Sequence, residues 1–146
     1  MVGRSPAPYL AVVSDAILAE RRLKVLIVED SAEVRGRLVS LLSEMPGLEV
    51  LWVAESVREA REVLQTLQPD VALLDLRLPD GSGLDVLREI RASISAQAFV
   101  IVMTAFPAPH LSQACLGAGA DLFLDKSGGF TELPSILRVL AGGRLA

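Results

Sequence analysis

The stretch Lys24-Val-Leu-Ile-Val-Glu-Asp30 decides how the rest of the chain folds. Residues 25–28 are apolar without alternation, and two acids follow them at once. A parallel strand covered on both faces has such an unbroken apolar pattern, whereas a strand with one face in water alternates. The stretch therefore predicts a buried parallel strand whose carboxyl end carries the carboxylates of Glu29 and Asp30.

Four further apolar runs have the length of strands, and helical spacing of apolar residues follows every run. The expected strands are 24–28, 49–54, 70–74, 99–103 and 121–124; the expected helices are 34–45, 57–67, 84–94, 111–118 and 133–140. Strands that alternate with helices in this way favour an α/β fold, a doubly wound parallel sheet with right-handed crossovers. Thr131 is expected to cap the last helix, with Pro134 in its first turn.

Composition excludes several classes of protein. The chain has 146 residues, enough for one domain, and is 51% hydrophobic, which excludes intrinsic disorder. One cysteine and one histidine exclude a disulfide framework and a cluster of such metal ligands. The net charge of −4 argues against direct binding of nucleic acid. With no secretory signal and no apolar run of about 20 residues, we expect a cytoplasmic protein that does not insert into membranes.

Ionisable and hydroxyl side chains follow most of the expected strands. In a doubly wound sheet of this size, ligands bind at the carboxyl ends of the strands where the strand order reverses. A strand order of 2-1-3-4-5 would bring Glu29, Asp30 and Asp75 together. Protonation of one acid or a bound cation, Mg²⁺ or Mn²⁺, would relieve the repulsion among the three carboxylates. Thr104 and Lys126 would add donors beside them. Such a site suits a phosphoryl group, with Asp75 as the nucleophile that accepts it.

Four segments together resemble the receiver domain of bacterial response regulators in two-component signalling. These segments are Val25–Ser31, Leu73–Leu84, Met103–Ala105 and Ala118–Lys126. The resemblance extends over about residues 23–141 and implies a flavodoxin-like (βα)5 sheet of strand order 2-1-3-4-5. Residues 1–22 would be an N-terminal extension, helical or flexible, and residues 142–146 a tail.

The resemblance also implies roles for the acidic residues. The carboxylates of Asp30 and Asp75 and the backbone carbonyl of Arg77 would bind Mg²⁺, with Glu29 acting partly through water. Asp75 would take its phosphoryl group from a sensor histidine kinase or a histidine phosphotransfer protein. The chain would then be no enzyme beyond catalysing its own phosphorylation and dephosphorylation.

Thr104 and Phe123 would form the switch that reports phosphorylation, with Lys126 beside the phosphoryl group. The surface that responds would consist of the fourth helix, fifth strand and fifth helix, where a downstream protein or a second copy of the chain would bind. Residues expected to contribute there are Leu111, Leu133, Leu137 and Arg138. One departure from the family is Ser127, which stands after Lys126 where a proline is usual, so the following loop is expected to differ.

Two alternatives remain open at this point. One is a metal-dependent phosphohydrolase on a similar sheet, although enzymes of the aspartate-nucleophile type need a second acid two residues after the nucleophile, where this chain has Arg77. The other is that the sequence is the receiver part of a longer DNA-binding regulator.

Overall fold

A computed structural model of the protein describes residues 22–145, so residues 1–21 of the expected extension lie outside the described part. The strands are β1 Leu23–Val28, β2 Leu48–Ala54, β3 Val71–Asp75, β4 Arg77–Leu78, β5 Gly81–Ser82, β6 Phe99–Thr104 and β7 Leu122–Asp125. The helices are α2 Ala32–Ser43, α3 Val57–Leu64, α4 Gly83–Arg91, α5 Pro109–Gly117 and α6 Lys126–Leu145.

Five parallel strands form one sheet in the order β2-β1-β3-β6-β7. Because β6 and β7 are the fourth and fifth of the expected strands, this confirms both the α/β class and the 2-1-3-4-5 order. The order reverses between β1 and β3, which are hydrogen-bonded neighbours. The carboxyl ends of these two strands therefore lie side by side.

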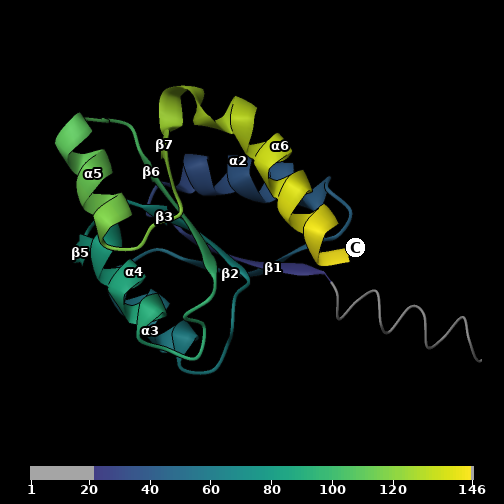
Figure 1. Cartoon of the computed structure of the whole chain (residues 1–146), viewed down its shortest axis with the longest axis horizontal. Helices are drawn as coiled ribbons and strands as arrows, with labels where there is room; N and C mark the ends of the chain where they lie inside the picture. Colours follow the sequence, from purple (N-terminus) through teal and green to yellow (C-terminus); the bar gives the residue numbers. More distant parts are fainter. Residues whose placement is uncertain (1–21, 146) are drawn as a thin grey trace, which may run out of the picture.

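Helices cover both faces of the sheet, with α2 and α6 on one face and α3, α4 and α5 on the other (Figure 1). The first strand shows why its sequence does not alternate. Leu26 and Val28 pack into the core beneath α3 and α4, while Val25 and Ile27 pack into the core beneath α2 and α6. All four side chains are fully buried, so water reaches neither face of β1.

The last helix differs from the expectation. It begins at Lys126 rather than after Thr131, because the Asp125 carboxylate accepts hydrogen bonds from the backbone N–H of Ser127 (2.9 Å) and from its hydroxyl (2.7 Å). That acceptor satisfies an N–H group that the first turn of a helix leaves without a partner. Pro134 consequently lies inside the helix, which continues to Leu145, past the expected start of a tail.

The short strands β4 and β5 form an antiparallel ribbon between β3 and α4, closed by the turn at Pro79-Asp80. None of the helices in residues 22–145 is long and apolar enough to cross a lipid bilayer.

Candidate functional site

Three acidic side chains meet at the carboxyl ends of β1 and β3. Glu29 and Asp30 follow β1, Asp75 ends β3, and one carboxylate oxygen from each lies within 4.8 Å of the other two. Glu29 is fully buried and Asp75 is 5% exposed, whereas Asp30 faces solvent. The structure therefore brings together the three acids that the sequence predicts at the reversal of strand order.

Lys126 is the cation that faces the two buried acids. Its Nζ lies 2.7 Å from Oε1 of Glu29 and 3.2 Å from Oδ2 of Asp75, and its side chain is 14% exposed. Within the described residues, the Lys126 ammonium is the charged partner of Glu29 Oε1. Glu29 Oε2 accepts the backbone N–H of Ser31 at 3.1 Å. One ammonium group thus forms ion pairs with two buried carboxylates.

The site changes the proton affinity of its members. Burial raises the pKa of Asp75 to about 7, and the negative charge of Glu29 acts in the same direction, against the charge of Lys126 and the backbone N–H of Arg77. Burial works to lower the pKa of Lys126, but its hydrogen bond to Glu29 and the charges of Asp75 and Glu29 outweigh burial and raise it. Burial, reinforced by the charge of Glu29, thus brings the pKa of Asp75 to about 7.

The donor set fits a hard divalent cation. Three carboxylates face one ammonium group, so a cation would relieve repulsion that Lys126 leaves uncompensated. Oxygen ligands with room for water are what Mg²⁺ requires. The Arg77 backbone N–H donates to Oδ1 of Asp75 at 3.2 Å, so the backbone of Arg77 lies directly beside the Asp75 carboxylate.

The connection from β3 to α4 is shaped by close backbone contacts. A Cβ atom at Gly83 would collide with the backbone carbonyl oxygen of Asp75, so the turn leaves no room for a side chain there. Asp80 reaches the start of α3, where its two carboxylate oxygens accept the N–H groups of Val57 (2.8 Å) and Arg58 (3.0 Å). These contacts hold the loop after Asp75 against the neighbouring helix.

Thr104 and Phe123 lie on adjacent strands, as expected. Thr104 is the last residue of β6, and Met103 just before it pairs with Asp75 of β3. Thr104 is 2% exposed, and its hydroxyl oxygen accepts the backbone N–H of Phe106 at 3.2 Å. Phe123 lies in β7 and packs, partly buried, against the core beneath α3, α4 and α5. The threonine hydroxyl is thus placed at the same edge of the sheet as the three acids.

Two arginine side chains at this edge were not anticipated from the sequence. The guanidinium of Arg77 lies 5.0 Å from the ring centroid of Phe106, whose ring is 64% exposed. Arg35, in the first turns of α2, donates to the backbone carbonyls of Glu29 and Asp30. The sequence signal that could have identified Arg35 was its position five residues after Asp30, on the helix that follows the acidic pair.

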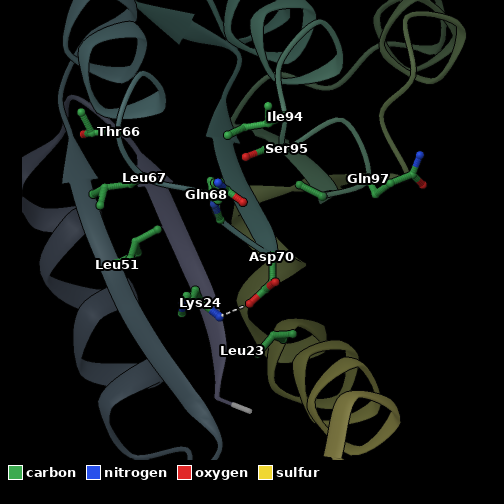
Figure 2. A pocket seen from close by; sticks show the side chains of 12 residues that line it. Leu23, Lys24, Leu51, Thr66, Leu67, Gln68, Asp70, Ile94, Ser95 and Gln97 are labelled. Atoms are coloured by element: carbon green, nitrogen blue, oxygen red, sulfur yellow. Dashed lines mark hydrogen bonds between the residues drawn. The ribbon is translucent and has the colours of Figure 1, made fainter. Parts of the chain in front are cut away.

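A cavity of about 700 Å³ lies at the opposite edge of the sheet, where the strands begin (Figure 2). Lys24 and Asp70 line it, and the Lys24 backbone N–H donates to Asp70 Oδ2 at 2.9 Å. None of the expected site residues lines this cavity. The cavity and the acidic site therefore lie at opposite edges of the sheet.

Comparison with known proteins agrees with this arrangement. The family model described as response regulator receiver domain matches residues 25–138. A protein-glutamate methylesterase/protein-glutamine glutaminase of Myxococcus xanthus is 41% identical over 104 residues, which cover 71% of this chain and 30% of that protein. The DNA-binding transcriptional activator DevR/DosR of Mycobacterium tuberculosis is 33% identical over 122 residues, which cover 84% of this chain and 56% of that protein. The chain thus spans about a third to about half of the length of these relatives.

Solved structures agree as well. The receiver domain of the putative response regulator NarL from Mycobacterium tuberculosis superposes with a TM-score of 0.74 at 29% identity, covering 84% of this chain and 98% of that one. The response regulator domain of Thermotoga maritima CheB gives a TM-score of 0.70 at 26% identity, covering 84% and 95%. A family model that matches most of the chain, relatives above 30% identity and the same sheet order lead to one conclusion: this chain belongs to the response regulator receiver domain family.

Proposed function

We propose that Asp75 is the phosphoacceptor of this receiver domain, and that Mg²⁺ binds beside it through Glu29, Asp30, Asp75 and the backbone carbonyl of Arg77. One observation carries the proposal. The Asp75 carboxylate lies 3.2 Å from the Lys126 ammonium and within 4.8 Å of two further acids, at the rim where the strand order reverses.

The proposed reaction transfers a phosphoryl group from a phosphohistidine of a sensor kinase or phosphotransfer protein. A carboxylate oxygen of Asp75 attacks phosphorus, the P–N bond breaks, and its electron pair returns to the imidazole, which takes up a proton from solvent. Bound Mg²⁺ would neutralise charge on the phosphoryl oxygens. Lys126 supplies a second positive charge from the side of β7, and the Thr104 hydroxyl can donate a hydrogen bond to the product. Hydrolysis of the acyl phosphate returns phosphate and the free carboxylate.

The same geometry supports a switch through Thr104 and Phe123. Movement of Thr104 toward a phosphoryl oxygen would release the N–H of Phe106 and open space beside β7, into which the Phe123 ring can turn. The responding surface comprises α5, β7 and α6, and we propose that a downstream protein or a second copy of the chain binds there. The chain's net charge of −4 supports a protein partner over nucleic acid.

The residues that form this surface need one correction. Leu133 and Leu137 were expected on it, but both are fully buried in the core beneath α2 and α6. They are the inward positions of α6, one helical turn apart. The exposed apolar side chains of this region are Val139, 74% exposed, and Leu116, 47% exposed.

Incubation of the full chain with acetyl phosphate and Mg²⁺ tests the acceptor. We expect intact mass to increase by one phosphoryl group, which hydroxylamine removes, and Asp75→Asn to abolish the increase. Asp70→Asn is the matched control, because Asp70 directly precedes β3 whereas Asp75 ends it. This variant should be phosphorylated normally. A hydroxylamine-labile increase in Asp75→Asn would assign the acceptor elsewhere, and continuous release of phosphate from many substrates would favour a phosphohydrolase.

A further inference from the structure

Arg35 reaches from α2 back to the loop that carries two of the three acids. Its Nη1 donates to the backbone carbonyl oxygens of Glu29 (3.1 Å) and Asp30 (2.8 Å), and its side chain is 21% exposed. Both carbonyls belong to the residues whose carboxylates face the site. We infer that Arg35 is a positioning residue for the metal site, which holds the backbone of the acidic pair and thereby the direction of its carboxylates.

The arginine is itself held from a third element. Nη1 also lies 3.5 Å from Oε1 of Glu55, in the connection between β2 and α3. The backbone N–H of Glu55 donates to Oε1 of Glu59 at 2.8 Å, and Oε2 of Glu59 accepts the indole N–H of Trp52 at 3.1 Å. Arg35 thus links the acidic loop to α2 and to the connection before α3, so a shift of the loop would break its hydrogen bonds to Arg35.

Such a link is needed because the acids repel one another. Three carboxylates within 4.8 Å would separate by moving the segment of Glu29 and Asp30, which follows β1, since Asp75 is held within the sheet. Mg²⁺ demands near-ideal octahedral geometry, with oxygens about 2.0–2.1 Å from the ion, whereas Ca²⁺ accepts more ligands in looser arrangements. A loop that drifts is therefore expected to lose Mg²⁺ affinity first and Ca²⁺ affinity less.

Charge alone predicts the opposite sign. Arg35 is a cation close to a cation-binding site, so its removal would strengthen Mg²⁺ binding if electrostatic repulsion were its main effect. Loss of positioning would weaken binding instead. The direction of the change in affinity therefore distinguishes the two roles without reference to phosphorylation.

The test is calorimetric titration of the full chain with Mg²⁺ and, separately, with Ca²⁺. The inference rests on the proposed metal site. We expect Arg35→Gln to weaken Mg²⁺ binding about tenfold, in the range found when groups that orient metal ligands are removed. Ca²⁺ binding should change less, so that the preference for Mg²⁺ falls. Arg35→Lys, which keeps a donor but loses the planar guanidinium, should recover part of the affinity.

Arg37→Gln is the matched control. Arg37 lies on the same helix, and its guanidinium pairs with Glu33 at the surface, 3.0 Å away. This variant makes the same change in charge without touching the acidic loop, so its Mg²⁺ affinity should match that of the unaltered chain or rise slightly. If Arg35→Gln unfolds, as judged by circular dichroism, Arg35→Lys replaces it, because that change keeps the positive charge and removes only the planar guanidinium.

Each outcome decides the matter. Weaker Mg²⁺ binding with a reduced preference over Ca²⁺, in Arg35→Gln or its Arg35→Lys substitute, supports positioning. Unchanged or tighter Mg²⁺ binding in the folded variant that is measured, Arg35→Gln or Arg35→Lys, overturns the inference and leaves the proposed function intact. Absence of Mg²⁺ binding by the unaltered chain overturns the proposed metal site and the inference with it.

Discussion

Replacing Asp75 by asparagine should make the metal-free protein more stable at alkaline pH, with an advantage that shrinks as the pH falls toward 4. The substitution nearly preserves the shape of the side chain and removes the charge that the site disfavours. Burial, reinforced by the charge of Glu29, raises the pKa of Asp75 from 3.8 to about 7. The folded state therefore holds a proton on this carboxyl over a pH range in which the unfolded chain has lost it.

The sign follows from that difference in proton binding. A group whose pKa is raised by folding contributes its full stability below the unfolded pKa, and this contribution is lost as pH rises through the folded pKa. Each pKa unit corresponds to about 1.4 kcal/mol, so the full change between pH 3.8 and above pH 7 is at most about 4 kcal/mol. Salt and water that reach the rim reduce it, and we expect about 1–3 kcal/mol between pH 5 and pH 8.5.

The measurement is urea unfolding in EDTA at several pH values, followed by circular dichroism. The unaltered chain should lose stability relative to Asp75→Asn between pH 5 and pH 8.5, and the two curves should converge only as the pH falls to the unfolded pKa of 3.8. Saturating Mg²⁺ should remove the difference, because a cation replaces the proton and stabilises the folded state that binds it. Parallel curves in EDTA would refute the assignment of a strained, protonated Asp75.

Three further predictions concern the surroundings of the site. Lys126→Met should slow phosphorylation by acetyl phosphate and lower the free energy of unfolding by about 2 kcal/mol at pH 8, measured by urea unfolding, because two buried acids lose their cation. Gly83→Ala should cost about 1–3 kcal/mol, since its Cβ collides with the Asp75 backbone; equal stability by thermal unfolding would contradict this. Arg91→Met should lower stability by about 2–3 kcal/mol in the same assay, because Arg91 donates to the carbonyls of Ala98 (2.6 Å) and Gly119 (2.7 Å), which would lose their partner.

Short sequence patterns were sufficient to predict hydrogen bonds between residues that lie within one helical turn of each other. The capping motif Ser82-Gly-Leu-Asp85 is a complete reciprocal box in the structure, because its donors and acceptors lie within one turn of helix. In the similar motif Ser56-Val-Arg-Glu59, the Ser56 hydroxyl accepts the N–H of Glu59, but the Glu59 carboxylate accepts the N–H of Glu55 and the indole N–H of Trp52 instead of completing the box. Whether the Glu59 carboxylate completed this capping box therefore depended on the position of Trp52, an exposed residue of β2.

Strand β2 shows a related limit. Val50 pairs with Val25 and Trp52 with Leu26, so Leu51 is an extra residue in the strand. Such a bulge changes which side chains face the core from that point onward. Periodicity along β2 could not locate it, because the bulge exists only relative to the neighbouring strand.

The sequence by itself determined the strands, their parallel arrangement and the edge at which Glu29, Asp30 and Asp75 meet. Unbroken apolar runs can be buried on both faces only in a covered parallel sheet, and the carboxyl ends of parallel strands share one edge. Tertiary structure alone decided the ion pairs of Lys126 and the backbone contacts of Arg35. Lysine and arginine side chains are long and have many rotamers, so their partners are selected by whichever groups the packed elements bring within reach.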